Sequence, residues 1–548
     1  MQILLVAINA RYSHSNPALY GLKNNLNRPC EIIEFNINQP LDYMLGEVHR
    51  KSPDILGLSC YIWNRQQVLA LANTFRKVVP NCTIIVGGPE AASTASQLLE
   101  DNPGVDYVLT GEGELAFKAF VSQLAEGRKP LFVPGLWYRD EQGKPRFIPA
   151  DPAINRPDLT EINFAYTSQD LQRLKGRIIY YESSRGCPYT CGYCLSSTDQ
   201  GVRFLPLDRV KKEISQICAS GARLVKFVDR TFNCQPERAK ELWDYLIRST
   251  PKEVHFHFEI GADLLDNESL TLLKAAPKGK FQFEIGVQST NPQVLAAVGR
   301  PDRTSRIAAN VRELAAAGNI HLHLDLIAGL PLEDWASFAA SFDRVFRMRP
   351  HRIQLGFLKV LPGTPVAASR ERYGLKHLDQ PPYEVLETNH LSYSELWMLK
   401  QIEELVETYG NSRRFSNTLT YLIDTAYQGS AFSFYLDLAR HWVETGLYHR
   451  KHKARDHYDL LVQFLEKKGM ADNEALNRLK LDYALSEQHS DLPKWAPQEV
   501  AEKTLRQEQH RLLKDPEFIL DSFSHLTGMK GREMIKRTRL VEVKLDDT

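Results

Sequence analysis

The sequence predicts an α/β protein in three parts: two successive strand–helix alternations and then a helical region. Short apolar runs alternate with amphipathic stretches over the first 130 residues, and a second alternation begins at residue 177. The strand patterns stop at about residue 392. Because alternating strands and helices fold into parallel sheets covered by helices, we expect two such sheets before the helical region.

The first alternation contains five apolar segments of strand length. They lie at residues 3–8, 31–35, 55–59, 83–88 and 107–111. Their short connections through helical segments predict a Rossmann-like sheet. The loops after the first, third, fourth and fifth strands should therefore line a ligand crevice at the carboxyl edge of this sheet.

The second alternation contains six segments of strand length, separated by helical stretches of 10–15 residues. The strands are expected at 177–182, 223–228, 254–260, 281–288, 321–327 and 352–360. Six β/α units without long breaks predict an open, partial (β/α)6 barrel.

These patterns divide the chain of 548 residues into four segments. They are an N-terminal Rossmann-like domain (1–135), a proline-rich linker (136–171), a barrel core (172–390) and a mostly α-helical C-terminal domain (391–548). Aromatic residues of the last segment recur at helical spacing, which is more typical of a core than of a substrate site. Residues 539–545 have the pattern of a final strand.

The composition narrows the choice of partners and location. A formal net charge of +1 gives no global basic field, so no nucleic-acid partner is indicated. The N-terminal MQILLVAINARYSH lacks the basic region of a signal peptide, and no stretch reaches the roughly 18 unbroken apolar residues of a membrane span. We therefore expect a cytoplasmic protein without a membrane partner.

Three of the eight cysteines are clustered: Cys187, Cys191 and Cys194 follow the first strand of the second alternation with CxxxCxxC spacing. Clustered thiols in a chain without an export signal favour a metal site over disulfides. Three thiolates can hold three irons of a 4Fe–4S cluster and leave the fourth iron open for chemistry. The alternative is a zinc knuckle or a structural cluster, but the next cysteine, Cys218, follows only after 24 residues.

The segment SSRGCPYTCGYCLSS, which contains these cysteines, resembles the signature loop of the radical S-adenosylmethionine (SAM) superfamily. The resemblance covers about residues 172–370 and implies a partial (β/α)6 barrel with the cluster at its open top. It implies that SAM binds the open iron and that Tyr193 lies against the adenine.

Other positions resemble SAM-binding positions of the same family. Asp229, in FVDRTF, follows the second strand, where the family binds the SAM amino group, although the common Gly-Gly-Glu form is absent. Glu259 ends the third strand, and Gln288 and Ser289 end the fourth, in EIGVQS. VLPGTP (360–365) resembles the turn that closes over adenine. The alternative for each is a helix cap, a turn or a polar residue of the barrel core.

The segments VGGPEAAS (86–93) and VDYVLTGEGE (105–114) resemble the cobalamin-binding domain of cobalamin-dependent radical SAM enzymes. Paired glycines after a strand let a large, flat ligand approach the backbone closely. No GxGxxG follows the first strand, which argues against NAD. The alternative is a structural domain without a ligand. The candidate cobalamin-binding residues are Ser59, Gly87, Gly88, Gly111, Glu112 and Gly113.

Together the resemblances imply a class B methyltransferase-like radical SAM enzyme with an uncharacterised C-terminal helical domain. Such an enzyme cleaves SAM reductively to a 5′-deoxyadenosyl radical and transfers a methyl group to an unactivated carbon. Its electron donor would be a flavodoxin or ferredoxin, and the substrate is not indicated. Two alternatives remain: a radical rearrangement with cobalamin as electron-transfer partner, and a non-enzymatic cobalamin or Fe–S sensor.

Overall fold

The computed structural model describes residues 1–128, 131–198, 201–487, 492–496, 500–522, 528–538 and 540–545. The chain divides into two compact units. The first contains residues 1–334, 348–350 and 356–392, and the second contains residues 335–347, 351–355 and 393–548.

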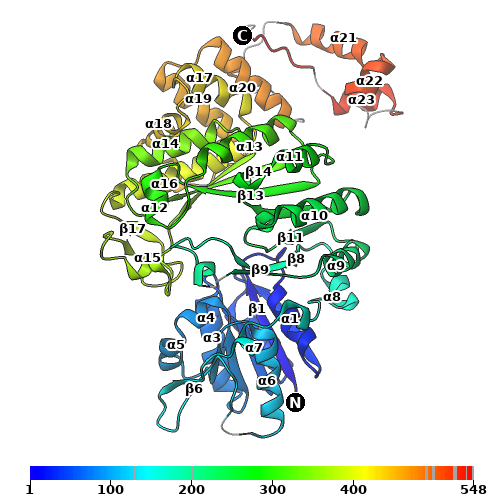
Figure 1. Ribbon diagram of the computed structural model, residues 1–548. Helices are drawn as coiled ribbons and strands as arrows, with labels where there is room; N and C mark the ends of the chain where they lie inside the picture. The colour runs from blue at the N-terminus through cyan, green and yellow to red at the C-terminus, as the bar shows by residue number, and fades with distance from the viewer. Residues whose placement is uncertain are drawn as a thin grey trace. The chain divides into compact units, whose positions relative to one another are not determined.

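The first sheet of the first unit is mostly parallel and has the strand order β2-β1-β3-β4-β5-β6-β7 (Figure 1). Its strands are β1 (Ile3–Asn9), β2 (Cys30–Asn36), β3 (Ile55–Ser59), β4 (Thr83–Gly87), β5 (Tyr107–Leu109), β6 (Leu136–Arg139) and β7 (Pro145–Phe147). The five predicted strands are therefore present, and their order reverses between β1 and β3. A reversal of this kind opens a crevice at the carboxyl edge.

Helices cover both faces of this sheet. They are α1 (Pro17–Asn25), α2 (Leu41–Arg50), α3 (Arg65–Val78), α4 (Pro89–Ser93), α5 (Ala95–Asp101) and α6 (Gly113–Ala125). Alternate residues of β1 point to opposite faces, so Leu4 and Val6 pack with α2 to α5, whereas Ile3 and Leu5 pack with α1 and α6. The result is a three-layer α/β domain.

The segment predicted as a proline-rich linker contains regular structure. β6 pairs antiparallel with β5 and with β7, and Trp137 stacks on Phe147 with ring centroids 4.9 Å apart. Pro145 opens β7 at the edge of the sheet, where a residue without an N–H group costs no ladder hydrogen bond. The same segment continues through α7 (Pro152–Asn155), the short 3-10 turn η1 (Leu159–Glu161) and α8 (Ser168–Arg173).

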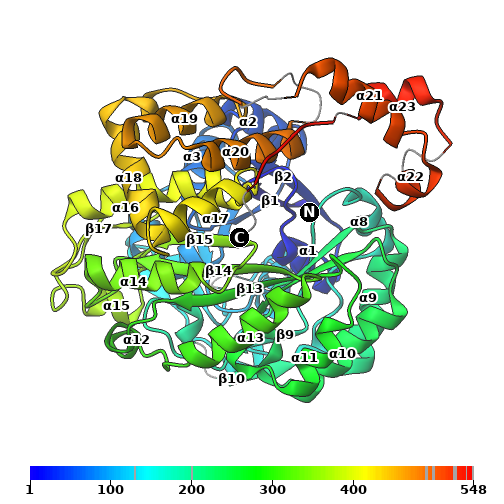
Figure 2. The same cartoon turned by 90° about the horizontal axis from the view of Figure 1, so that it is seen from above.

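The second sheet has the order β15-β14-β13-β12-β11-β8, and all the strand pairs from β8 to β14 are parallel. Its strands are β8 (Ile179–Tyr181), β11 (Leu224–Phe227), β12 (His255–Ile260), β13 (Phe281–Gln288), β14 (His321–Ala328) and β15 (Arg352–Phe357). The helices of this part are α9 (Leu207–Ala219), α10 (Pro236–Ser249), α11 (Asn267–Lys274), α12 (Pro292–Ala297) and α13 (Thr304–Ala317). Figure 2 shows α9, α10, α11 and α13 following one another along this sheet. The predicted α/β fold class is confirmed.

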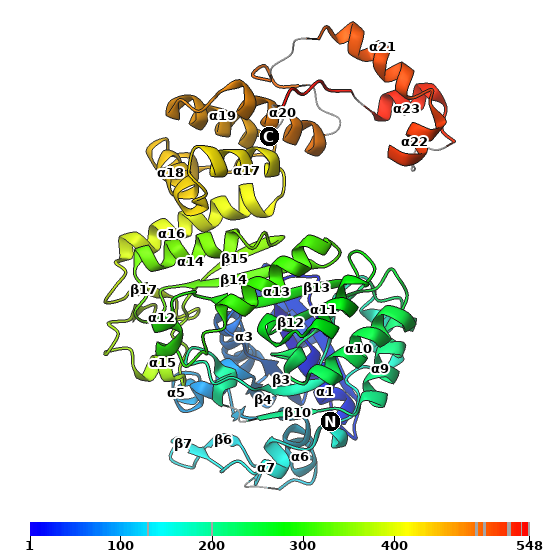
Figure 3. The same cartoon turned by 45° about the horizontal axis from the view of Figure 1, so that its top comes forward.

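The second unit is helical (Figure 3). Its main helices are α14 (Trp335–Phe346), α16 (Tyr393–Leu405), α17 (Ser416–Thr425), α18 (Ala431–Glu444), α19 (Asp456–Lys468) and α20 (Asn473–Ser486). Shorter helices follow: α21 (Glu502–Leu512), α22 (Pro516–Ser522) and α23 (Gly531–Arg537). Phe432 of α18 makes edge contacts with Trp335, Phe338 and Phe342, and these contacts join α14 to the C-terminal helices. The sequence pattern had placed α14 in the barrel core, because nothing local reveals this partner.

Two further expectations concern the helical unit. Phe432, Phe434, Tyr435 and Trp442 are buried, which confirms that the aromatic residues form a core. The predicted final strand is wrong for residues 540–545, which form no strand, whereas Arg539 lies outside the described residues. None of the described helices is both long enough and apolar enough to cross a membrane.

Candidate active site

A cavity of about 830 Å³ lies in the first unit at the carboxyl ends of β3, β4 and β5. All six candidate cobalamin-binding residues line it: Ser59, Gly87, Gly88, Gly111, Glu112 and Gly113. Pro17 and Ala18, from the segment after β1, line it as well. The structure thus brings together the four loops that the strand order predicted to meet.

The two glycines after β4 have different structural roles. A Cβ on Gly87 would meet only the Leu109 carbonyl oxygen at 3.6 Å, which is an ordinary contact. Gly88 has φ of +110°, and a Cβ there would lie 2.5 Å from the carbonyl oxygen of Cys60. Gly88 is therefore required by backbone packing. Gly87 is the position at which an added side chain would test the cavity without breaking the fold.

The wall of the cavity near the end of β3 contains polar and aromatic side chains. Asn16 donates a hydrogen bond from Nδ2 to Oγ of Ser59 at 3.0 Å, so this predicted contact already has a protein partner. Tyr61, which lines the cavity, stacks on Trp63 with ring centroids 4.5 Å apart. No histidine is among the described residues that line the cavity.

His14, in the loop after β1, contacts the other part of the same unit. Its Nδ1 lies 2.9 Å from the hydroxyl of Tyr180 in β8. Burial lowers the pKa of His14, and the charges of Arg11, Lys226 and Arg177 lower it further. The imidazole is therefore held neutral and is oriented by Tyr180.

The cysteine loop begins in a two-stranded ribbon, β9 (Ser184–Cys187) with β10 (Gly201–Phe204). The Gly192 amide donates to the carbonyl of Val298 at 2.8 Å, and the Val366 amide donates to the carbonyl of Gly192 at 2.9 Å. These bonds fix the middle of the loop between segments that follow β13 and β15. No cysteine of the described residues is in a disulfide.

The surroundings of the three thiols suit an iron–sulfur cluster. Arg300 Nη1 lies 3.6 Å from Sγ of Cys191, and Thr231 Oγ1 lies 3.8 Å from Sγ of Cys187. A guanidinium and a hydroxyl beside thiol groups favour the thiolates that bind iron, and at Cys187 the hydroxyl opposes the rise in pKa that burial causes. One loop thus supplies three soft ligands and no fourth cysteine, as an open iron requires.

The candidate SAM-binding residues differ in their contacts. Asp229 is 1% exposed, and its carboxylate accepts hydrogen bonds from Ser183 N at 3.0 Å and from the Ser183 and Ser184 hydroxyls at 2.6 Å each. Burial raises the pKa of Asp229 to about 6, although these hydrogen bonds oppose the rise. Asp229 therefore anchors the segment that leads into β9, and a contact with SAM stays a prediction.

The other candidates surround the end of β13. Gln288 has φ of +70°, and its buried Oε1 has no hydrogen-bond partner among the described residues. Ser289 is buried and donates a hydrogen bond to Glu333 at 2.6 Å. Burial raises the pKa of Glu259, which lies 4.0 Å from Arg230. Burial also raises the pKa of Tyr193 next to Cys191.

The second sheet has two unlike faces, a feature that the sequence analysis missed. One face is apolar and fully buried, and Trp243 of α10 packs on Phe258 and Phe283 there. The strand registers place six ionisable residues together on the opposite face, here called the polar face. They are Lys226, His257, Glu259, Glu284, His323 and Asp325. The alternation in VHFHFEI, FQFEIGVQ and HLHLDLI was the signal.

Charges on the polar face are paired unequally. Burial disfavours the ionised Glu284, but a hydrogen bond from His257 Nε2 at 3.0 Å and the charge of Lys226 lower its pKa to about 2. Burial and the carboxylates of Glu284 and Glu259 raise the pKa of Asp325 to about 8. Asp325 is therefore mostly protonated at neutral pH.

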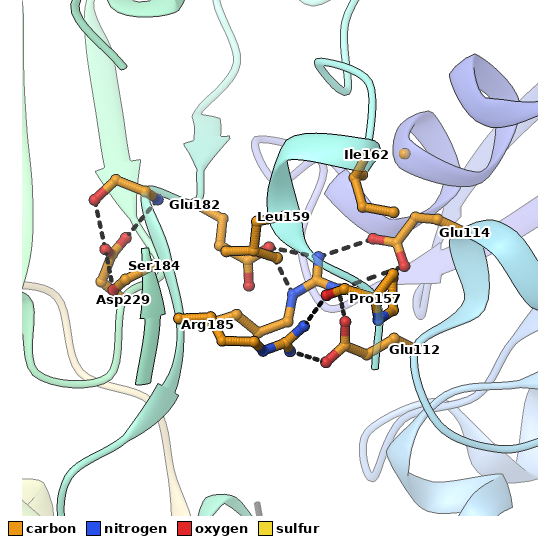
Figure 4. A network of polar contacts seen from close by, with 12 residues as sticks. Glu112, Glu114, Pro157, Leu159, Ile162, Glu182, Ser184, Arg185 and Asp229 are labelled. Atoms are coloured by element: carbon orange, nitrogen blue, oxygen red, sulfur yellow. Dashed lines mark hydrogen bonds and ion pairs between the residues drawn. The ribbon is translucent and has the colours of Figure 1, made fainter. Parts of the chain in front are cut away.

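An ion-pair network joins the β9–β10 ribbon, which leads into the cysteine loop, to the glycine loop between β5 and α6 (Figure 4). Arg185 donates to Glu112 at 2.6 Å, to Glu114 at 2.8 Å and to Glu182 at 2.6 Å. Arg203 also pairs with Glu112. Glu112 thus uses its carboxylate for two arginines.

The fold and these two loops define a class of protein: a cobalamin-binding domain joined to a radical SAM core. Family models match both parts. The model "B12 binding domain" matches residues 3–121, and "Radical SAM superfamily" matches residues 181–345. A third, "Protein of unknown function (DUF4080)", matches residues 371–547. The chain therefore contains a B12-binding domain and a radical SAM domain.

Known relatives resemble the chain at moderate identity. It is 26% identical over 349 residues to the cobalamin-dependent radical SAM methyltransferase TokK of Streptomyces tokunonensis, which covers 60% of this chain and 51% of the relative. It is 26% identical over 351 residues to the 2-(S-pantetheinyl)-carbapenam-3-carboxylate methyltransferase of Streptantibioticus cattleyicolor, with the same coverage of each chain. The chain spans about half the length of these curated relatives.

A solved structure supports the fold. The radical SAM methyltransferase TsrM from Kitasatospora setae, solved with cobalamin and a 4Fe–4S cluster bound, superposes with a TM-score of 0.57 at 18% identity. The match covers 70% of this chain and 79% of TsrM. At this identity the similarity shows a shared fold.

The three-thiol loop predicts one 4Fe–4S cluster per chain. Replacement of Cys187, Cys191 and Cys194 by Ala together should remove the cluster, because no other soft ligand lies in the loop. Iron and sulfide analysis of anaerobically reconstituted protein measures this. Cys218→Ala and Cys234→Ala are the matched controls and should keep a full cluster. A cluster that survives the triple replacement would refute the assignment.

Bound cob(II)alamin should lack a histidine ligand from the protein, since no histidine among the described residues lines the cavity and His14 is held by Tyr180. An axial nitrogen splits each cobalt line of the paramagnetic resonance spectrum into three. We expect no such splitting with cobinamide, which lacks its own base. A triplet that persists with cobinamide and disappears in His14→Ala would identify His14 as the ligand and contradict the prediction.

Asp325→Asn should stabilise the protein increasingly as pH rises. The raised pKa means that the folded chain keeps a proton that the unfolded chain loses above its usual value of 3.8, so the wild type loses stability between pH 4 and pH 8. Asn has no such proton, and we expect an advantage of about 1–3 kcal/mol at pH 8 that shrinks toward pH 5. Thermal melts at both pH values measure it. The exposed Asp244→Asn is the control, and an equal effect at both pH values would exclude this cause.

Proposed function

We propose that this protein is a radical SAM enzyme that holds a 4Fe–4S cluster on Cys187, Cys191 and Cys194 and a cobalamin in the adjoining cavity. One observation carries the proposal. The cavity that the six candidate cobalamin residues line is also lined by Arg185, two residues before Cys187, and by Leu195, which directly follows Cys194. The predicted cluster loop and the predicted corrinoid loops thus border one space.

The chain's residues fit these cofactors in complementary ways. The cysteines supply three iron ligands, and the orphaned Oε1 of Gln288 supplies an acceptor for SAM. Tyr193, Asp229, Glu259 and Ser289 are proposed as further SAM residues. Pro362 and Gly363, from the VLPGTP turn, line the same cavity. When bound, the cofactors supply reductive cleavage of SAM to a 5′-deoxyadenosyl radical and a methyl group on cobalt.

We place the substrate against the polar face of the second sheet. Tyr180, which lines the cavity, is in register with Lys226, so the polar face continues the cavity wall. A face with paired cations and carboxylates binds a ligand that offers several hydrogen-bonding groups. The substrate is therefore polar where it meets the sheet, and its methyl-accepting carbon points toward the cavity.

Methyl transfer to an unactivated carbon is the reaction we favour. The two curated relatives and the TsrM structure are named methyltransferases. A radical rearrangement would use the same neighbourhood of cysteine loop, glycine loops and polar face, so the names of these relatives are what favour methyl transfer. A flavodoxin or ferredoxin electron donor, a cytoplasmic location and the division into four segments given in the sequence analysis complete the proposal.

Product analysis of SAM tests this function. After reduction, cluster-loaded protein should form 5′-deoxyadenosine, and addition of methylcobalamin with a competent substrate should add S-adenosylhomocysteine. Gly87→Val should weaken hydroxocobalamin binding at least ~10-fold, because its side chain enters the cavity wall while the fold tolerates a Cβ there. It should still form 5′-deoxyadenosine.

The controls test SAM cleavage and cobalamin binding separately. Gly87→Ala should bind hydroxocobalamin more tightly than Gly87→Val, since it fills less of the space. A cluster-loaded wild-type chain that cleaves no SAM would refute the enzyme. A folded wild-type chain that does not bind hydroxocobalamin at high micromolar concentration would refute the corrinoid site alone.

A further inference from the structure

The arginine–carboxylate network between the two loops is built from residues far apart in the sequence. Arg185 and Arg203 are register partners on the β9–β10 ribbon, and both guanidinium groups reach Glu112. Glu112 stands between Gly111 and Gly113 of the corrinoid loop. Glu114, in the first turn of α6, binds Arg185 at 2.8 Å. The ribbon is therefore clamped to the corrinoid loop at two points.

Low exposure gives these ion pairs more weight than surface pairs have. The side chains of Glu112 and Glu114 are each 13% exposed, and that of Arg185 is 20% exposed. Charges that are largely removed from water must keep their partners, because an unpaired buried charge is costly. The network therefore resists separation of the two loops, whereas an exposed pair would not.

The position of Arg185 connects this clamp to the cluster. Only Gly186 lies between Arg185 and Cys187, and β9 pairs with β10 through Cys187, so Arg185 and the first cysteine lie on one ribbon. Arg185, Glu112 and Glu114 all line the cavity. A ligand in the cavity thus touches the same side chains that set the entry to the cysteine loop.

We propose that Arg185 is a positioning residue that couples corrinoid occupancy of the cavity to the SAM affinity of the cluster loop. The inference rests on the proposed function and adds its internal regulation. Corrinoid binding holds the loop of Glu112 in one position. Because Arg185 is paired with Glu112 and lies two residues before Cys187, the start of the cysteine loop is held in position as well. A planar guanidinium is needed because it binds Glu112, Glu114 and Glu182 at once, which a single ammonium cannot do with the same geometry.

Coupling between two ligands is reciprocal and measurable as a ratio of affinities. The test uses the full chain with its cluster reconstituted, without reductant so that no SAM is consumed. Equilibrium dialysis gives the Kd of SAM with and without saturating hydroxocobalamin. We expect the wild type to bind SAM at least ~5-fold more tightly when hydroxocobalamin is present. Hydroxocobalamin should be bound more tightly by the same factor when SAM is present.

Variants of the clamp decide the assignment. In Arg185→Gln the ratio should fall to about 1, and Arg185→Lys should restore part of it. The matched control is Arg248→Gln on α10, which removes an exposed pair with Asp244 and should keep the wild-type ratio. The Mössbauer spectrum of the oxidised cluster gives a second readout without reductant: its change on SAM addition should depend on hydroxocobalamin in the wild type and not in Arg185→Gln.

Each outcome has one meaning. The inference would be overturned if hydroxocobalamin did not change the Kd of SAM in the wild type. It would also be overturned if the change were as large in Arg185→Gln as in the wild type. Either result leaves the proposed function intact. A wild type that binds neither SAM nor hydroxocobalamin would instead refute the proposed function. If Arg185→Gln does not hold its cluster, Glu114→Gln decides, because it removes one partner and leaves Arg185 in place; a wild-type ratio there overturns the inference.

Discussion

The ion pairs of Arg185 with Glu112 and Glu114 impose the constraint on which the rest of the site depends. Each sheet of the first unit offers its own carboxyl-edge loops, and a cofactor pair can react only if those loops meet in one register. The partly buried ion pairs hold the loops in a fixed relative position, because their hydrogen bonds are directional. Pulling the loops apart would also leave buried charges without partners. The apolar cores of the two sheets fix each layer, whereas the network fixes one loop against the other.

Local rules explain which parts of the fold could be read from the sequence. Five of the seven strands of the first sheet and the six of the second were predictable, because each is a short apolar run bounded by turn residues. The cysteine loop was predictable because its chemistry lies within eight residues. The glycine loops were predictable because they follow strands whose carboxyl ends must share an edge.

Features that depend on distant partners could not be read in this way. β7 looked like linker because three residues beginning with Pro145 carry almost no strand signal without Trp137 beside them. The pairing of Arg185 with Glu112 spans 73 positions, and no spacing rule connects such residues. Gly88 was expected to admit a ligand, but its positive φ and the nearby Cys60 carbonyl show that the backbone itself needs the glycine.

The two-faced second sheet gives the strongest indication of where chemistry occurs. Parallel sheets covered on both faces are usually apolar throughout, so an ionisable face costs desolvation that packing alone would not select. For Glu284, the hydrogen bond with His257 and the charge of Lys226 offset the desolvation of the carboxylate. Asp325 instead avoids the buried charge by keeping its proton. A buried carboxyl group with a strongly raised pKa destabilises the fold at neutral pH, and such groups are concentrated at functional sites. His323 Nε2 lies 3.4 Å from Asp325 Oδ1. A polar ligand on this face would give Asp325 a further partner, and because Tyr180 joins the face to the cavity, that ligand would lie within reach of both proposed cofactors.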